Sequence, residues 1–292
     1  MLGARSGVES ALSFEPPLQS VITAIRSIIA SRELIAILVW RNITVRYKQA
    51  YLGIGWAIFR PFALMLVFTL VRSLVGIPSG NVPYPVLAFA ALMPWMFFQE
   101  SASEGVLSVV ANSALIRKIY FPREIFPITG IMTKLVELGI NALILAALMA
   151  WFGVLPSAQI FWAPAIIIYT MLASLTIALA GAALNVYYRD VGTALPVLLS
   201  LLMYASPVIY PLDLVKDKLL VQRAAGEWSD VLYTVYMLNP LAGIIDSFQN
   251  VVLRGLPPDF HALIPGAILV AIALPISYFY FKRAESYFAD VI

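Results

Sequence analysis

Three glutamates stand in stretches of sequence that are otherwise apolar, where an ionised side chain is costly unless it has a specific role. Glu100 and Glu104 are four residues apart, so a helix would place both on one face. Glu137 follows Lys134 by three residues, which is the spacing of an ion pair within a helix. These positions allow two interpretations, a proton relay in a proton-coupled carrier or a set of structural ion pairs. The ion pair is the simpler interpretation for Lys134 and Glu137.

Composition excludes several other kinds of chemistry. The 292 residues contain no cysteine and a single histidine, His261, which rules out disulfides, thiol nucleophiles and multi-histidine metal sites. The phosphate-binding loop sequence, Gly followed after four residues by Gly-Lys-Ser or Gly-Lys-Thr, is not present either. We therefore expect no catalytic residue, no metal site and no cofactor in this chain.

Two short polar segments, residues 115–127 and 185–192, carry cations and aromatic rings between apolar stretches. The first predicts a short amphipathic helix that ends at Pro122. Cations are expected in any cytoplasmic loop, but large aromatic side chains in a short aqueous loop favour docking to a soluble partner. The candidate docking residues are Arg117, Lys118, Tyr120, Phe121, Pro122, Arg123, Glu124, Tyr188, Arg189 and Asp190.

The elements that would position these residues are membrane-spanning helices. Hydrophobic residues make up 61% of the chain and charged residues 12%, with a mean hydropathy of +0.89. In soluble domains, about 45–50% of the residues are hydrophobic and about 25% are charged, so this composition excludes a soluble globular protein. Six apolar runs are long enough to cross a hydrocarbon core of about 30 Å. They cover residues 54–76, 84–110, 128–152, 160–187, 193–209 and 262–281, and they predict an all-α integral membrane protein with six transmembrane helices.

Lysine and arginine gather before the first predicted span, in the loops after the second and fourth, and after the sixth. The positive-inside rule then places both termini in the cytoplasm. We expect residues 1–53 to form a cytoplasmic segment and residues 54–292 the transmembrane domain. Apolar residues on one face from Leu18 to Ile29 predict an interfacial helix. The chain would enter the membrane at Arg46, Tyr47, Lys48 and Trp56, where cations and an aromatic ring suit the interface.

The long segment between the fifth and sixth predicted spans, residues 210–259, is expected outside the membrane. Its apolar part, Val231 to Val252, is interrupted by Asn239 and Pro240, and proline removes a backbone donor. The two pieces are too short to cross, so we expect two short helices that dip into the membrane and line a cavity. With Tyr233 and Tyr236, the Asn239-Pro240 break would form an external gate.

The chain resembles one family over residues 34–281. The motifs that carry the resemblance occur in the family's order and spacing; Phe121-Pro122-Arg123-Glu124 is the specific one and the others are weak singly. They are Arg46-Tyr47-Lys48 with Leu52-Gly53 and Trp56, Pro94-Trp95 with Phe97-Phe98, Phe121-Pro122-Arg123-Glu124 with Pro127, Tyr188-Arg189-Asp190-Val191, Ser206-Pro207-Val208-Ile209-Tyr210, and Asn239-Pro240. The family is the membrane subunit of ABC-2 type polysaccharide and polyol-phosphate exporters, which move lipid-linked O-antigen, capsule and teichoic acid across bacterial membranes.

Two arginines depart from the family pattern. Arg60 stands where an uncharged polar residue is more common, and Arg72 replaces an apolar residue. They are 12 residues apart, or about 18 Å along a helix, so they cannot both lie at the two edges of the membrane core. One of them must snorkel or face water.

The resemblance implies a homodimer in the bacterial inner membrane, with two copies of an ATPase that bind ATP and Mg²⁺ beneath it. The cargo would be a lipid-linked polysaccharide of the O-antigen kind, and no nucleic acid is involved. The alternatives are teichoic acid, capsule, or a smaller lipid or drug. Sugar rings lie well on aromatic rings, and the resemblance places the first and fifth spans at the dimer's channel. The channel residues would then be Trp56, Phe59, Tyr204 and Tyr210.

Overall fold

The computed structural model describes residues 26–48, 53, 55–76, 82–118, 121–224 and 229–288, and these residues are helical with connecting turns and contain no strand. A short helix covers residues 26–30. The longer helices follow it in this order: α2 (Arg32–Lys48), α3 (Gly55–Val75), α4 (Tyr84–Ala111), α5 (Ser113–Ile116), α6 (Ile125–Trp151), η2 (Ala158–Trp162), α7 (Ala163–Tyr187), α8 (Asp190–Tyr204), α9 (Leu212–Ala224), α10 (Ser229–Leu238), α11 (Pro240–Gln249), the π-helical turn η3 (Asn250–Arg254) and α12 (Phe260–Glu285).

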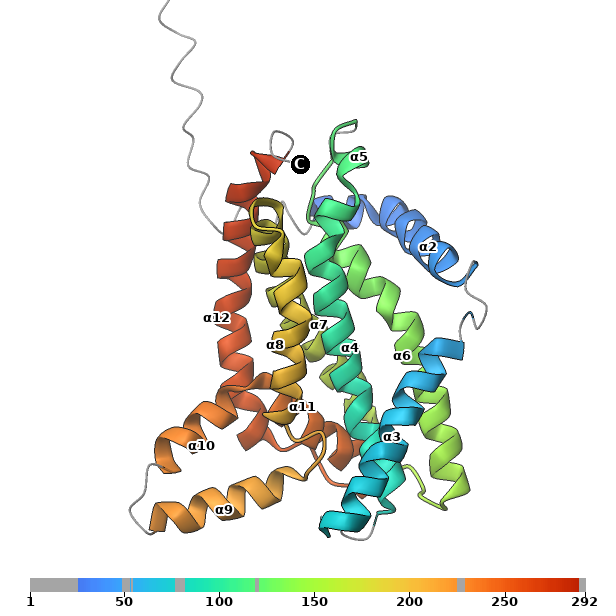
Figure 1. The fold of residues 1–292 in the computed structure, drawn as a ribbon, viewed down its shortest axis with the longest axis vertical. Coiled ribbons are helices and arrows are strands. Elements are labelled where there is room, and N and C mark those ends of the chain that lie inside the picture. Colours follow the sequence, from blue (N-terminus) through green and yellow to red (C-terminus); the bar gives the residue numbers. More distant parts are fainter. Residues whose placement is uncertain are drawn as a thin grey trace, which may run out of the picture.

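The helices form a bundle with two distinct ends (Figure 1). Helices α2 and α5 and the turn between α7 and α8 lie at one end, which we call the α2 end. Helices α9 and α10 lie at the other, the α9 end. The helices that run between these ends, in alternating directions, are α3, α4, α6, α7, α8 and α12 (Figure 1). This alternation agrees with the order of the predicted spans.

Helix α4 is the centre of the bundle. It packs against α3, α6, α7, α8 and α11, and most of its side chains from Tyr84 to Val109 are buried. Glycines let α4 and α7 approach closely. A Cβ added to Gly105 would lie 2.4 Å from the Cβ of Ala178, and one added to Gly181 would lie 2.4 Å from a methyl carbon of Val106. Such small residues are how helices in membranes maximise their van der Waals contact.

Four helical segments are long and apolar enough to cross a membrane, namely Gly55–Val75, Ile125–Trp151, Ala158–Tyr187 and Phe260–Glu285. They confirm four of the six predicted spans. A fifth span exists if the bent pair Val231–Leu238 and Pro240–Arg254 is taken as one. Helix α4 is outside this set, and α8 has only 15 residues, which is about 22 Å of helix.

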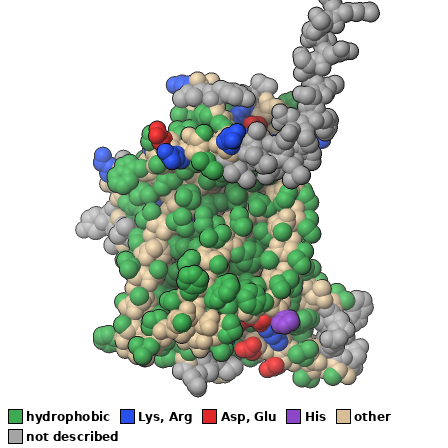
Figure 2. Space-filling model, turned by 180° about the vertical axis from the view of Figure 1, so that it is seen from behind, with side chains coloured by type: hydrophobic (Ala, Val, Ile, Leu, Met, Phe, Trp, Pro, Cys, Tyr) green, Lys and Arg blue, Asp and Glu red, His purple; other side chains and the backbone are tan. Residues whose placement is uncertain are grey.

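Large apolar side chains are exposed over much of the surface of the bundle. Figure 2 shows them as a broad zone between the two ends, with blue cationic side chains at the α2 end. A soluble protein would not expose apolar patches of this extent, whereas a lipid bilayer would cover them. The predicted interfacial helix, Leu18 to Ile29, lies mostly outside the described residues.

Candidate functional site

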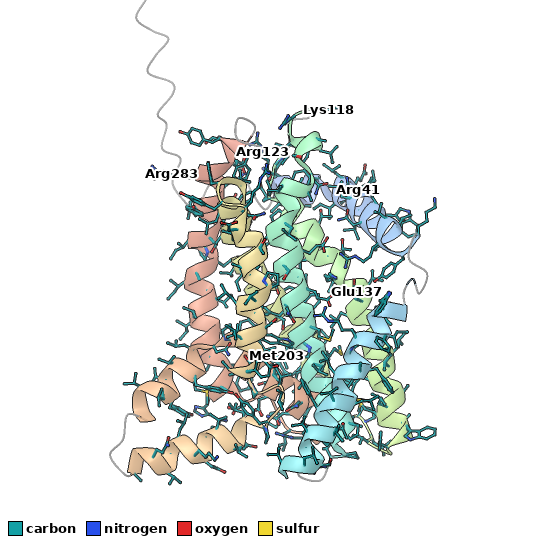
Figure 3. The ribbon with its side chains drawn as sticks, viewed as in Figure 1. Arg41, Lys118, Arg123, Glu137, Met203 and Arg283 are labelled. Carbon is teal, nitrogen blue, oxygen red and sulfur yellow. The ribbon has the colours of Figure 1, made fainter. Side chains whose placement is uncertain are left out.

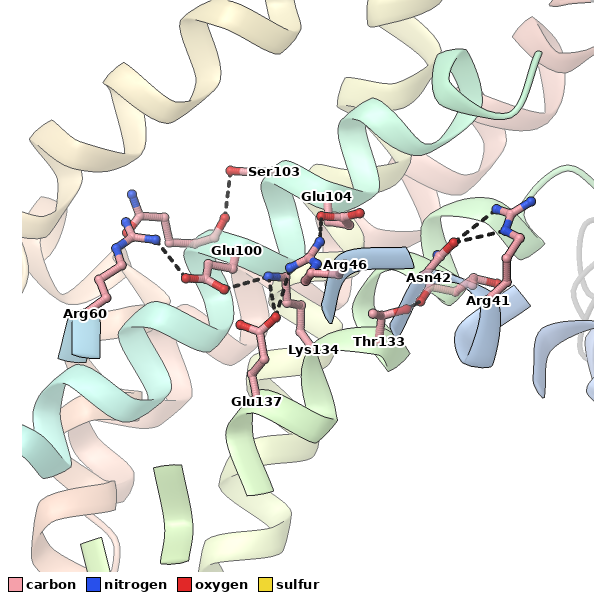
Figure 4. Close-up of polar contacts among 12 residues, drawn as sticks. Arg41, Asn42, Arg46, Arg60, Glu100, Ser103, Glu104, Thr133, Lys134 and Glu137 are labelled. Atoms are coloured by element: carbon pink, nitrogen blue, oxygen red, sulfur yellow. Dashed lines mark hydrogen bonds and ion pairs between the residues drawn. The ribbon is translucent and has the colours of Figure 1, made fainter. Parts of the chain in front are cut away.

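Six charged side chains from four helices meet near the α2 end (Figure 4). Helix α2 contributes one, α3 one, α4 two and α6 two. We call this set the charged cluster, and its members are Arg46, Arg60, Glu100, Glu104, Lys134 and Glu137. The cluster holds three cations and three carboxylates, so its charges balance.

Lys134 is the most buried cation of the cluster, with 6% of its side chain exposed. Its ammonium lies 2.7 Å from an oxygen of Glu100 and 3.0 Å from an oxygen of Glu137. The second oxygen of Glu100 accepts a hydrogen bond from Arg60 at 2.8 Å. Arg46 lies 2.9 Å from Glu137 and 2.5 Å from Glu104. The ion pairs therefore form one continuous chain from α3 through α4 and α6 to α2.

A cavity of about 480 Å³ opens beside the charged cluster. All six charged residues line it, together with Tyr47, Gln99, Ser103 and Asn141. The Oδ1 atom of Asn141 is buried and accepts no hydrogen bond from any described residue. The cavity therefore has charged groups in its wall although it lies next to helices that can span a membrane.

The cluster confirms the predicted pairing of Lys134 with Glu137 and extends it beyond what the sequence indicated. Glu100 and Glu104 do not face each other as a relay pair, since each is bound to a cation from another helix. The sequence pattern predicted Arg46 at the membrane surface and did not indicate its two carboxylate partners, Glu104 and Glu137. The available signal was the presence of unmatched charges, Arg60 in one apolar run and two glutamates in the next.

A second cavity, an aromatic groove of about 380 Å³, adjoins the first. Its walls come from α3, α4 and α8, and the two cavities share Trp56, Arg60, Met96 and Gln99. Among the predicted channel residues, Trp56 and Phe59 line this groove, and their rings meet edge to face at 5.6 Å. The structure therefore brings two of these rings together with α8.

The other two predicted channel residues lie at the far end of α8. Tyr204 is the last residue of the helix and its side chain is exposed. Tyr210 follows in the turn, and its hydroxyl donates a hydrogen bond to the Tyr204 carbonyl at 2.9 Å. Neither residue lines the aromatic groove.

The predicted docking residues of the first loop divide into exposed and internal side chains. Arg117 and Lys118 are exposed at the α2 end, and Figure 3 labels Lys118 there. Glu124 is 1% exposed and accepts a hydrogen bond from Lys282 of α12 at 2.9 Å. The guanidinium of Arg123 binds the Glu285 carbonyl and lies 5.8 Å from the Phe288 ring. Arg123 and Glu124 therefore join this loop to the end of α12.

The described aromatic residue of the same loop, Phe121, is less exposed than docking to a partner would require. Phe121 is half-buried, and its ring lies 5.3 Å from that of Phe126. Pro122 is also half-buried. Tyr120 lies outside the described residues. In the second predicted loop, Tyr188, Arg189 and Asp190 are all exposed.

At the α9 end, the structure confirms the helix break at Asn239 and Pro240, where the helices bend by 72°. The Asn239 side chain accepts a hydrogen bond from the Leu241 amide at 3.1 Å and donates one to Ser206 at 2.9 Å. Tyr233 and Tyr236 pack against Leu212, Met237, Ala242 and Ala262, which belong to α9, α10, α11 and α12. Through its hydrogen bond to Ser206, Asn239 also contacts the turn that follows α8.

Comparisons with known proteins agree on one family. The family model described as "ABC-2 type transporter" matches residues 33–253. An O-antigen export system permease protein from Myxococcus xanthus is 26% identical over 93% of this chain and 100% of its own length. An O-antigen export system permease protein from Klebsiella pneumoniae is 24% identical over 89% of this chain and 95% of its own length. A polysialic acid transport protein from Escherichia coli is 24% identical over 74% of this chain and 79% of its own length. Because the family model covers most of the chain, this protein belongs to the ABC-2 type transporter family.

Proposed function

We propose that this chain is the permease subunit of an ATP-driven exporter that moves a lipid-linked polysaccharide of the O-antigen kind across the bacterial inner membrane. The observation that carries the proposal is the similarity over nearly the whole chain to relatives named as O-antigen export permeases. The similarity to the polysialic acid transport protein covers a smaller part of this chain, 74% of its length. Capsule, teichoic acid and smaller lipids are therefore the alternative cargoes within the same family.

The distribution of charge supports a cytoplasmic α2 end and six crossings. Cations are concentrated at that end, which Figure 2 shows in blue. They are Arg26, Arg32, Arg41, Arg46, Lys48, Arg117, Lys118, Arg123, Arg189, Lys282 and Arg283. At the α9 end, α9 and η3 carry Lys216, Lys218, Arg223 and Arg254. An excess of lysine and arginine marks the cytoplasmic side. Both termini would then lie in the cytoplasm.

An ATPase would dock at the α2 end and bind the ATP and Mg²⁺ that this chain has no motif to hold. The exposed residues that support this are Arg117, Lys118, Tyr188, Arg189 and Asp190. Arg123 and Glu124 would act indirectly, because they hold the docking loop against α12.

Two copies of the chain would enclose the path of the polysaccharide. Helix α3 exposes Trp56 and Phe59, and α8 exposes Tyr204. Aromatic rings bind the apolar faces of sugars, and a gap between two symmetry-related bundles leaves more room than the interior of one. The bent pair α10 and α11 would close this path from outside.

The charged cluster argues against the alternative of a proton-coupled carrier. Each of its three carboxylates lies within 3.0 Å of a cation. Each carboxylate thus has a cation from another helix as a partner, which is the arrangement of structural ion pairs rather than of a proton relay. The cluster is better suited to hold α2, α3, α4 and α6 together.

The proposed function is tested in a strain that lacks this permease and retains its ATPase. The wild-type chain is expected to restore polysaccharide on the cell surface, detected by immunoblot. Intracellular accumulation with the wild-type chain present would contradict the proposal.

Docking is tested by charge reversal in the same strain. Lys118→Glu with Arg189→Glu should reduce copurification of the ATPase at least tenfold and leave the permease folded. Lys218→Glu, an exposed change at the α9 end, is the matched control and should have no effect. Equal copurification in all three proteins would refute docking at the α2 end.

A further inference from the structure

Arg60 occupies the boundary between the charged cavity and the aromatic groove, since it lines both. Its side chain is 52% exposed, more than that of any other member of the charged cluster. Within the described part of the chain, only the Nη1 atom of its guanidinium donates a hydrogen bond, to Glu100. An arginine has five N–H donors in a planar fork, so most of the donors of Arg60 have no hydrogen-bond partner among the described residues.

The cluster does not depend on Arg60 for its charge pairing. Glu100 also binds Lys134 at 2.7 Å through its other oxygen. Lys134 in turn binds Glu137, which is shared with Arg46. The outermost arginine can therefore exchange a partner while Glu100 keeps a buried cation.

The position of Arg60 along α3 sets its depth in the membrane. Helix α3 begins at Gly55, and Arg60 is five residues further along. At a rise of 1.5 Å per residue, Arg60 lies about 7–8 Å from the start of the helix. The whole helix has 21 residues, or about 31 Å, which matches the hydrocarbon core. Arg60 thus lies in the quarter of the helix nearest the α2 end. An arginine there can snorkel to the level of lipid headgroups.

The residues beside Arg60 form a sequence of chemical environments along one face of α3. Trp56 is one turn closer to the α2 end, exposes 54% of its surface and offers an aromatic platform. Ala63 and Leu64 are one turn further into the membrane and line an apolar part of the groove with Met96. From the α2 end inward, α3 therefore presents an aromatic ring, then a cation, and then an apolar surface.

Two polar groups of α4 in the same walls have no partner among the described residues. The side-chain amide of Gln99 lines both cavities, and no described residue shares a hydrogen bond with it. The indole Nε1 of Trp95 is buried in the groove wall and donates to no described acceptor. Because Trp95 is fully buried, only the Gln99 amide is placed to contact a ligand in the groove, and acceptor oxygens on that ligand would supply the partners that this amide lacks.

We infer that this groove binds the phosphate-bearing headgroup of a glycolipid, with the phosphate on Arg60, the adjoining sugar on Trp56 and the start of the hydrocarbon chain along Ala63 and Leu64. A guanidinium binds phosphate oxygens in a planar, bidentate arrangement. The order of groups in a lipid-linked sugar is ring, phosphate and hydrocarbon, which is the order of environments along α3. This inference rests on the proposed function and makes Arg60 a specificity-determining residue for the anionic headgroup.

The test measures lipid binding by the complete permease and ATPase complex in phosphatidylcholine nanodiscs. The probes are phosphatidic acid, diacylglycerol and inorganic pyrophosphate, so that a lipid phosphate, a lipid without phosphate and a free phosphate anion are compared. The wild-type complex should bind phosphatidic acid at least tenfold more tightly than diacylglycerol, and pyrophosphate should compete weakly. Arg60→Gln should weaken phosphatidic acid binding about tenfold, and Arg60→Lys less.

The matched control is Arg72→Gln, which removes the same charge from the α9 end of the same helix and should change binding less than twofold. Equal weakening by Arg60→Gln and Arg72→Gln would overturn the inference, as would unchanged binding in Arg60→Gln. Binding of pyrophosphate as tight as that of phosphatidic acid would also overturn it, in favour of a free anion. Export by the wild-type chain is scored separately, so loss of the inference does not count against the proposed function.

Discussion

Replacing Lys134 by methionine tests whether the charged cluster holds the helices together. The ammonium of Lys134 is 6% exposed and binds two carboxylates at 2.7 and 3.0 Å. Breaking a buried ion pair costs about 3–5 kcal/mol when it leaves a charge uncompensated. Here Glu100 keeps Arg60 and Glu137 keeps Arg46, so we expect a smaller loss of about 2–3 kcal/mol.

Arg60→Gln is the matched comparison within the same cluster. Its side chain is 52% exposed, and exposed ion pairs contribute about 0–1 kcal/mol. For a chain of this length, about 1 kcal/mol corresponds to about 2–4 °C in unfolding temperature. Lys134→Met should therefore lower the unfolding temperature by about 4–12 °C, and Arg60→Gln by less than about 4 °C.

The assay is thermal unfolding of the purified permease in one detergent at one scan rate, because membrane proteins often unfold irreversibly. A second variant, Lys134→Met with Glu137→Gln, restores the charge balance that the single change upsets. Since the two residues are in contact, the double variant should lose less stability than the sum of the single variants. If Lys134→Met costs no more than Arg60→Gln, or if the two changes are additive, the cluster does not stabilise the bundle as we describe.

Two further predictions concern packing and pH. Gly105→Val should prevent stable folding or lower the unfolding temperature by more than about 5 °C, because its Cβ would lie 2.4 Å from that of Ala178, whereas Gly139→Val meets nothing within 4 Å and should be tolerated. Burial alone would raise the pKa of Asp259, but its hydrogen bond with Lys216 holds that pKa below its usual value. The resulting stability is present above about pH 4 and is lost as the pH falls through the folded-state pKa, so Asp259→Asn should flatten the acid limb of a plot of unfolding temperature against pH.

Local patterns in the sequence were sufficient for the parts of the fold that depend on neighbouring residues. The spacing of Lys134 and Glu137 predicted their ion pair, which the structure confirms at 3.0 Å. Asn239 and Pro240 predicted a helix break because proline cannot donate a backbone hydrogen bond, and the bend is there. Four long apolar runs predicted helices of spanning length, and these too are confirmed.

Contacts between distant residues could not be predicted in this way. Arg46 and Glu104 are 58 residues apart, and Glu124 and Lys282 are 158 apart. A single sequence records which charges are unmatched but not which helices become neighbours. For this reason Glu124 was expected on a docking surface, whereas its side chain is bound within the chain.

The position of α4 explains how a helix with two glutamates can belong to a membrane bundle. Hydropathy measures how well a helix suits lipid, but α4 is surrounded by α3, α6, α7, α8 and α11, and most of its side chains are buried. Its two carboxyl groups would be costly in hydrocarbon alone, and both are paired with cations from other helices. The side chains of α4 must therefore pack against neighbouring helices rather than against lipid. The close contacts of Gly105 with Ala178 and of Val106 with Gly181 in α7 are examples of this packing. Burial among other helices thus explains why the composition of α4 does not identify it as a membrane-spanning helix.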